Sequence, residues 1–259
     1  MTTALVTGAT SGIGNEFVRQ LAEKGHDLVL VARDRARLEN VSDEIQRAYK
    51  VRTEILVADL GDRAQMGKVA ERLADEARPV DLLVNNAGYG LRGSFLQNDV
   101  EVEEELFEVL CKAVMVLSHA AAGAMRRRGR GAIVNVSSVA SFAAMGTYSA
   151  AKSWVTVFSE GLSTELAGSG VSVTALCPGF TRTEFHDRAR LSMERLPAVM
   201  WLDTDDLVRQ CLVDVAQGRV VSVPGPQYKA LVGVMHVVPR GLVRALSGGL
   251  HRRRRAAGG

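Results

Sequence analysis

Seven short runs of aliphatic and β-branched residues recur along the chain, and most are separated by longer stretches with helical patterning. The runs are TALVTG, DLVLVAR, TEILVADL, VDLLVNNAG, AIVNVSS, VSVTALCPG and RVVSVPG. Alternation of this kind is typical of βαβ units around a parallel sheet. Several runs are apolar almost throughout, as expected when helices cover both faces of the sheet. We therefore predict an α/β fold, a doubly wound parallel sheet of about seven strands with right-handed crossovers.

Composition limits the class of protein. The 259 residues are 47% hydrophobic and 24% charged, which suits one large globular domain. The net charge of +3 comes largely from the terminal HRRRR, so no nucleic-acid-binding face is expected. Cys111, Cys177 and Cys211 form no C-x-x-C pair, so neither a disulfide framework nor a metal site is predicted. With no apparent signal peptide and no long uninterrupted apolar run, we expect a cytoplasmic protein.

Two segments stand apart from the alternating pattern. Residues 184–202 lie between the sixth strand and a helix that Asp203 or Thr204 would cap, and they form a candidate lid over a substrate. Residues 1–224 are predicted to form the main domain and residues 225–259 a C-terminal, amphipathic, arginine-rich extension. In that tail, Leu242, Leu246 and Leu250 follow helical spacing. It could pack on the core or at a subunit interface, and peripheral membrane contact is the less favoured alternative.

The segment TGATSGIG follows the first strand directly and opens the first helix. It places glycines at Gly8, Gly12 and Gly14. Glycines here let the backbone turn sharply and approach a diphosphate, while the helix N-terminus offers free N–H groups and the positive end of its dipole. The pattern predicts a dinucleotide site in a Rossmann-type fold.

The end of the second strand bears on which dinucleotide is bound. Ala32 stands where a carboxylate would receive a ribose hydroxyl pair, and Arg33 follows it. An arginine at this place favours a 2′-phosphate through a charge-assisted contact. Asp34 could cap the next helix or repel the phosphate. We expect NADP(H) as the preferred cofactor, with NAD(H) as the alternative.

Five motifs in order make the chain resemble the classical short-chain dehydrogenases/reductases. They are TGATSGIG, NNAG at 85–88, NVSS at 135–138, YSAAK at 148–152 and PGFTRT at 178–183. The resemblance extends from about Thr2 to about Pro224. It implies a catalytic domain that transfers hydride between a nicotinamide and a carbonyl or alcohol group.

The resemblance implies three catalytic residues. Tyr148 would be the acid/base at the substrate oxygen, and Lys152 would favour its phenolate and hold the nicotinamide ribose. Ser138 would hydrogen-bond the substrate oxygen. Ser137 is the alternative serine, since strand alternation lets only one of the two face the site.

The predicted cofactor site combines the glycine loop and Arg33 with residues that the resemblance supplies. Asp59 would contact the adenine, Asn86 and Gly88 would line the adenosine side, and the loop after the sixth strand would orient the carboxamide. The full set is Gly8, Thr10, Ser11, Gly12, Ile13, Gly14, Arg33, Asp59, Leu60, Asn86, Ala87, Gly88, Tyr148, Lys152, Pro178, Gly179, Thr181 and Thr183.

Two positions depart from the family pattern. Leu110 stands where the family usually carries an asparagine that holds a water of a proton relay, so either the relay is rearranged or turnover is slow. Ser138 also precedes Tyr148 by fewer residues than usual, so a shorter loop must connect them.

Mostly apolar residues occur in the loops expected to surround the substrate. They are Tyr89, Leu91, Phe95, Phe185, Met193, Leu196, Met200 and Trp201, and the nearby His186 is assigned no role. We expect an NADP(H)-dependent oxidoreductase acting on a small, lipophilic ketone, aldehyde or alcohol such as a steroid, retinoid or fatty-acyl derivative. The alternative is a non-catalytic NADP(H) sensor or scaffold on the same fold. The resemblance also implies a homodimer or homotetramer.

Overall fold

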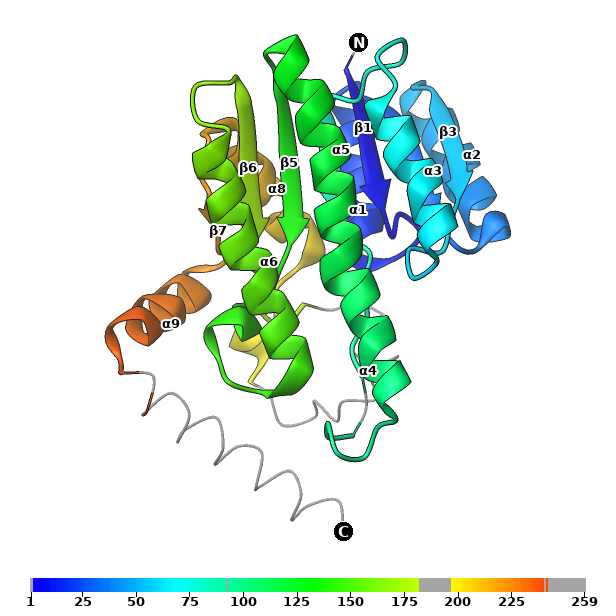
Figure 1. Ribbon diagram of the computed structural model, residues 1–259. Coiled ribbons are helices and arrows are strands. Elements are labelled where there is room, and N and C mark those ends of the chain that lie inside the picture. The colour runs from blue at the N-terminus through cyan, green and yellow to red at the C-terminus, as the bar shows by residue number, and fades with distance from the viewer. Residues whose placement is uncertain (1, 92, 182–196, 240, 242–259) are drawn as a thin grey trace.

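One parallel sheet organises the structure (Figure 1). The computed structural model describes residues 2–91, 93–181, 197–239 and 241. Within these ranges seven strands pair in the order β3-β2-β1-β4-β5-β6-β7, and every pair is parallel. The strands are β1 (Thr3–Thr7), β2 (Asp27–Ala32), β3 (Thr53–Val57), β4 (Leu82–Asn85), β5 (Gly131–Val136), β6 (Val171–Leu176) and β7 (Val221–Ser222). Each predicted run overlaps one strand, and the doubly wound α/β fold is confirmed.

Helices cover both faces of this sheet. They are α1 (Gly12–Glu23), α2 (Arg35–Tyr49), α3 (Arg63–Ala74), α4 (Val100–Phe107), α5 (Ala113–Arg128), α6 (Gly146–Glu165), α8 (Thr204–Ala216) and α9 (Pro226–Val237). Figure 1 shows α3, α5 and α6 in front of the sheet and α1 and α8 behind it. One apolar cluster joins the sheet to α1, α2 and α8, and a second joins it to α3 and α5. Burial on both faces accounts for the apolar strands.

Aspartates at three helix starts accept hydrogen bonds from first-turn N–H groups. Asp34 caps α2 by accepting from the Arg37 amide at 3.1 Å, and Asp62 caps α3 by accepting from the Gln65 amide at 2.8 Å. Asp203 caps α8 by accepting from the Asp205 amide at 2.9 Å. Of the two residues expected to cap α8, the cap is therefore Asp203. Asp34 likewise has a structural role at its helix N-terminus.

The helix pair α4 and α5 forms one continuous helical segment, Val100–Arg128. Its middle, Glu108–Lys112, is a π-helical turn. Among the described residues, this segment is long and apolar enough by composition to cross a membrane, yet half of its most apolar window is buried within the domain. A mostly core-packed helix of a globular domain meets the same criterion.

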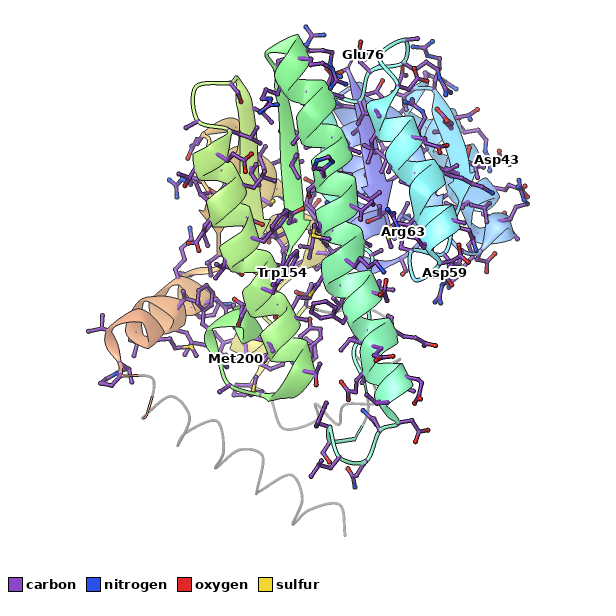
Figure 2. All side chains as sticks on the ribbon, in the orientation of Figure 1. Asp43, Asp59, Arg63, Glu76, Trp154 and Met200 are labelled. Atoms are coloured by element: carbon purple, nitrogen blue, oxygen red, sulfur yellow. The ribbon has the colours of Figure 1, made fainter. Side chains whose placement is uncertain are left out.

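The strand order reverses between β1 and β4, because β1 pairs with β2 on one side and with β4 on the other. Ligands of open parallel sheets bind at such a switch point, beyond the carboxyl ends of the strands. The arrowheads of β1 and β5 in Figure 1 point toward this end. Figure 2 places Asp59 and Met200 toward the same end.

Beyond β6, part of the chain lies outside the described residues. Of the predicted lid, only 197–202 is described, and it contains the short helix η3 (Ala198–Met200). A bridge between Thr181 and Leu202 joins the two ends of the 182–196 gap. Leu242, Leu246 and Leu250 of the predicted amphipathic tail also lie outside the described residues. The division at residue 224 stays a prediction, although α9 packs against the main domain.

Candidate active site

The glycine loop between β1 and α1 needs glycine for its backbone conformation and its close packing. Gly8 and Gly12 have φ of 67° and 54°, a region that L side chains rarely adopt. A Cβ on Gly14 would lie 2.2 Å from the Gly8 carbonyl oxygen, so only glycine fits this crossing. Ser11 is the N-cap of α1, but its side chain makes no capping hydrogen bond. Thr10 and Ile13 flank these positions, and Ile13 packs on the core. The first-turn N–H groups of α1 point toward this site.

The end of β4 is fixed against this loop. The Asn86 side-chain amide donates to the carbonyl oxygens of Thr7, at 2.9 Å, and Gly8, at 3.3 Å. The buried Thr7 hydroxyl oxygen accepts from the Asn86 and Ala87 amides at 2.9 and 3.0 Å. Thr7 was not among the predicted site residues. Its position next to Gly8 at the end of a buried strand was the signal that could have found it.

Two opposite charges meet at the ends of β2 and β3. Arg33 Nη1 lies 3.8 Å from Asp59 Oδ2, and both side chains are exposed. The other Asp59 oxygen accepts from the Gly61 amide at 2.9 Å, so the carboxylate has a fixed orientation. Leu60 is buried beside it. Arg33 and Asp59 are thus paired at this edge, and Asp34 beside them caps α2.

The two serines at the end of β5 point in different directions. The Ser137 hydroxyl is buried, donates to the Lys152 carbonyl oxygen at 2.8 Å and lies 2.7 Å from the Thr156 hydroxyl. Ser138 instead lies near Tyr148, and its side chain lowers the Tyr148 pKa in part. Ser137 thus attaches β5 to α6, and Ser138 faces Tyr148.

A compact turn closes the short connection between Ser138 and Tyr148. The helix η2 (Val139–Phe142) follows Ser138, whose hydroxyl oxygen accepts from the Ala140 amide at 3.1 Å. The Ser149 hydroxyl, one residue after Tyr148, donates back to the Ala143 carbonyl at 2.6 Å. These contacts hold the short loop on α6, so its reduced length still brings Ser138 to Tyr148.

Burial shifts the pKa values of Tyr148 and Lys152 in opposite directions, because it favours the neutral form of each side chain. Burial raises the pKa of Tyr148 to about 12, and the hydrogen bond from Ser138 offsets this only in part. Burial lowers the pKa of Lys152 to about 8. The Lys152 ammonium lies 5.8 Å from the Tyr148 ring centroid and donates to the Val136 carbonyl at 2.7 Å. In the protein without a bound cofactor, desolvation therefore dominates the pKa of Tyr148, and the lowering expected from Lys152 together with a bound oxidised nicotinamide stays a prediction.

Leu110 closes the back of this site. Only 1% of its surface is exposed, and it packs with Leu106, Cys111 and Ala151 beside Tyr148. A Cβ on Gly88 would lie 2.7 Å from Leu110 Cδ2 and 3.9 Å from Lys152 Nζ. The leucine expected from the sequence thus occupies the space between the NNAG turn and the catalytic helix.

The loop after β6 lies against α9. Pro178 is buried, and its carbonyl oxygen accepts from the Val139 amide at 3.0 Å. The Thr181 hydroxyl donates to the Gly179 carbonyl at 3.0 Å. A Cβ on Gly179 would lie 2.1 Å from the ring of Tyr228, a residue of α9 that sequence reasoning did not single out. Thr183 lies outside the described residues.

The predicted substrate contacts divide into separate groups. Tyr89 and Leu91 pack beside Tyr148, and Met200 packs in the apolar cluster around Tyr228. The rings of Trp201 and Phe180 lie 6.3 Å apart. Phe95 lies elsewhere, in an open hollow with Val100 and Phe107 on α4. Phe185, His186, Met193 and Leu196 lie outside the described residues.

The residues present fit a nicotinamide dinucleotide. Gly14 lets the start of α1 cross the Gly8 backbone at contact distance, Arg33 and Asp59 mark the adenosine end, and Tyr148 and Lys152 mark the other end. Across the described ranges, His, Cys, Asp and Glu side chains nowhere gather in a group of three or more that could hold a metal ion.

Comparison with known proteins agrees with this geometry. The family model described as short chain dehydrogenase matches residues 2–194. A short-chain dehydrogenase from Sphingobium yanoikuyae, in complex with NADPH, is 38% identical and superposes with a TM-score of 0.84, covering 91% of this chain and 94% of its own. The bulky-bulky ketone specific alcohol dehydrogenase from Comamonas testosteroni is 31% identical with a TM-score of 0.79, covering 93% and 96%.

An enzyme with a named reaction is similar over much of its length. The galactitol 2-dehydrogenase (L-tagatose-forming) of Cereibacter sphaeroides is 35% identical over 80% of this chain and 81% of that protein. With the family model, the fold and the site in agreement, the chain belongs to the short-chain dehydrogenases/reductases, oxidoreductases that act on alcohol and carbonyl groups with NAD(P).

Proposed function

We propose that this protein is an NADP(H)-dependent oxidoreductase that transfers hydride between the nicotinamide and the carbonyl or alcohol group of an apolar substrate. The observation that carries the proposal is the arrangement of Ser138, Tyr148 and Lys152. The serine side chain is close enough to the tyrosine to lower its pKa, and the lysine lies one helical turn further along α6. All three are at the end of the sheet where the glycine loop opens.

Each side chain has a separable role in that reaction. The bound nicotinamide supplies or accepts the hydride. Tyr148 is the group that gives a proton to the substrate oxygen in reduction, and its raised pKa of about 12 keeps it protonated at neutral pH. Ser138 hydrogen-bonds the same oxygen and stabilises the charge that develops on it. Lys152 holds the nicotinamide ribose and, when charged, favours the phenolate that alcohol oxidation requires.

The preference for NADP(H) is supported by Arg33. It is exposed at the end of β2, where it lies 3.8 Å from Asp59, and the neighbouring Asp34 caps α2. A 2′-phosphate would meet the Arg33 guanidinium with a charge-assisted contact, while Asp59 stays oriented by the Gly61 amide. The Sphingobium relative is in complex with NADPH. NAD(H) is the weaker cofactor in this proposal.

An apolar substrate is supported by the surroundings of Tyr148. Leu106, Leu110 and Ala151 form an apolar cluster there, with Tyr89 and Leu91 packed on it. Apolar walls with a few placed polar groups are typical of small-molecule sites. The Comamonas relative acts on bulky-bulky ketones. We therefore propose ketones with two bulky substituents as the first substrates to test, followed by steroid, retinoid and 3-oxoacyl derivatives.

The test is NADPH oxidation by the full chain with this substrate panel, beside the Tyr148→Phe variant. We expect the variant to lose about 100- to 10,000-fold in kcat, the usual contribution of a positioned general acid. Its affinity for NADPH, measured by fluorescence titration, should stay within about threefold of the wild-type value, because the phenol oxygen makes a small part of the contacts. Activity of the variant near that of the wild-type enzyme would contradict the role of Tyr148.

A second candidate function is a non-catalytic NADP(H) sensor. Buried Leu110 favours it, since an apolar side chain there leaves no place for a water beside Lys152. The proximity of Ser138 to Tyr148 favours catalysis, because a sensor needs the glycine loop and does not need an acid/base pair. Tight NADPH binding without turnover of any substrate in the panel would favour the sensor.

We also propose that the protein is a homo-oligomer in the cytoplasm. Phe107 on α4, Met115 on α5 and Val157 on α6 are large apolar side chains left exposed on these helices, as expected of surfaces that pair with another copy. The three cysteines are free and buried, which suits a reducing compartment. Light scattering after gel filtration tests the assembly, and a monomeric mass for the wild-type protein would contradict it.

A further inference from the structure

We propose that Tyr228, on α9 and outside every motif of the sequence, is a positioning residue for the nicotinamide half of the cofactor. Its hydroxyl joins the loop after β6 to the chain that enters α8. The inference rests on the proposed function, because it takes the Pro178–Thr181 loop as the place of the nicotinamide carboxamide. Tyr228 acts through that loop and is not itself placed against substrate or cofactor.

The phenol of Tyr228 is buried, and its hydroxyl both accepts and donates a hydrogen bond. Only 1% of the residue is exposed. Its hydroxyl oxygen accepts from the Phe180 amide at 3.0 Å, and its proton goes to the Met200 carbonyl at 2.6 Å. Phe180 lies between Gly179 and Thr181 in the predicted cofactor loop, whereas Met200 ends η3. One side chain therefore connects two segments that are twenty residues apart in sequence.

Packing around Gly179 shows that the ring and the loop are fitted to each other. A Cβ on Gly179 would lie 2.1 Å from both Cε2 and Cζ of Tyr228. Its φ lies outside the left-handed region, so the structure gives no conformational reason for glycine there. The contact with the Tyr228 ring supplies the reason. The phenol reaches the Phe180 amide because residue 179 has no side chain.

Further contacts join the cofactor loop, the η3 segment and α9. The Leu202 amide donates to the Phe180 carbonyl at 2.8 Å, and Gln227 donates to the Val199 carbonyl at 3.1 Å. The start of α9 thus holds η3 through Gln227 and holds both η3 and the cofactor loop through Tyr228. Phe180 has both of its backbone polar groups engaged in this junction. Losing the phenol would leave the Phe180 amide without this partner and weaken the tie that fixes the loop.

The test compares two ligands that share an adenosine end. NADPH reaches the loop after β6, whereas adenosine 2′,5′-bisphosphate occupies only the part of the site near Arg33. For Tyr228→Phe we expect the Kd of NADPH to rise about tenfold, from the loss of buried hydrogen bonds, and the Kd of the bisphosphate to stay unchanged. A merely structural defect would weaken both ligands together. Equal affinity of variant and wild type for NADPH would overturn the proposal.

A matched control removes a tyrosine hydroxyl far from the loop. Tyr49 on α2 lies near Arg19, whose pKa it raises, and Tyr49→Phe should leave the affinities for both ligands unchanged. If NADPH affinity falls equally in Tyr228→Phe and Tyr49→Phe, the effect is not specific to Tyr228 and the proposal is wrong. If the wild-type protein binds neither ligand, the proposed cofactor itself is wrong, an outcome distinct from failure of the tyrosine.

A measurement on the wild-type protein covers the case in which Tyr228→Phe does not fold. Because the Phe180 amide donates to a buried phenol, it should exchange slowly with solvent deuterium, and peptides that contain it should show protection. Rapid exchange of this amide in the folded wild-type protein would overturn the proposal without any variant. In a folded Tyr228→Phe protein, we expect the protection at Phe180 to be lost while that of β6 remains.

Discussion

The buried lysine of the candidate site should destabilise the fold at neutral pH, and replacing it should reveal by how much. Lys152 is 5% exposed, and burial lowers its pKa from 10.5 to about 8. In the unfolded chain the lysine binds its proton more tightly, so stability rises as the pH increases from about 8 to about 10.5. Because the pKa falls on folding, keeping Lys152 charged lowers the free energy of unfolding by about 3 kcal/mol at pH 7.

The perturbation is Lys152→Met, an uncharged side chain of similar length. Relative to wild type, the variant should gain about 3 kcal/mol in free energy of unfolding at about pH 7 from this effect, and only about 1 kcal/mol at about pH 10. Cys111 and Tyr148, with pKa values near 11 and 12, stay largely neutral over this range and do not mask the change. The variant also loses the bond to the Val136 carbonyl, and the contribution of this bond to the charged form is already contained in the folded-state pKa.

The assay is urea unfolding of the cofactor-free proteins at the two pH values, with the difference between variant and wild type compared across pH. Lys68→Met on the exposed face of α3 is the control and should show no such change. A variant-to-wild-type difference that is the same at both pH values would refute the reasoning, because it would mean that Lys152 is as well solvated in the folded state as in the unfolded chain. At neutral pH the loss of activity and the gain in stability should appear in the same variant.

Three further substitutions test other parts of the site. Arg33→Ala should weaken NADPH binding about tenfold and leave NADH binding nearly unchanged, since a charge-assisted phosphate contact contributes roughly 1.5–3 kcal/mol; an unchanged ratio of the two Kd values would mean that Arg33 is not the selector. Gly14→Ala would bring a methyl group within 2.2 Å of the Gly8 carbonyl, so titration should show at least about a tenfold loss in affinity for either dinucleotide. Leu110→Asn should lower the free energy of unfolding by about 2–5 kcal/mol in denaturant titrations, because it replaces a buried apolar side chain with an amide; a neutral effect would show that water already reaches this position.

Local sequence patterns were sufficient for the fold and for much of the site's layout. The apolar runs mark strands because burial on both sheet faces leaves few polar positions, and Asp203 marks a helix start because its side chain can satisfy a first-turn amide. Strand alternation allowed only one of Ser137 and Ser138 to face the site, and the family resemblance selected Ser138; the structure shows the two pointing in different directions.

The parts that the sequence did not predict depend on contacts between distant segments. Thr7 reads as an ordinary strand residue until folding places β4 beside it. Tyr228 lies nearly fifty residues from Phe180, and no local pattern connects them. The raised pKa of Tyr148 depends on burial, which a motif of two residues on a helix does not reveal.

The late position of Tyr228 in the chain also determines when the cofactor site can be completed during synthesis. The ribosome makes the glycine loop first, but the residue that fixes the opposite end of the cofactor site lies more than two hundred positions later. At translation rates of roughly 5–20 residues per second, a nascent chain spends about 10–40 s with Gly14 made and Tyr228 not yet made. During that interval the chain has the phosphate loop without the tie to Phe180, so complete cofactor binding must await the emergence of α9 from the ribosome.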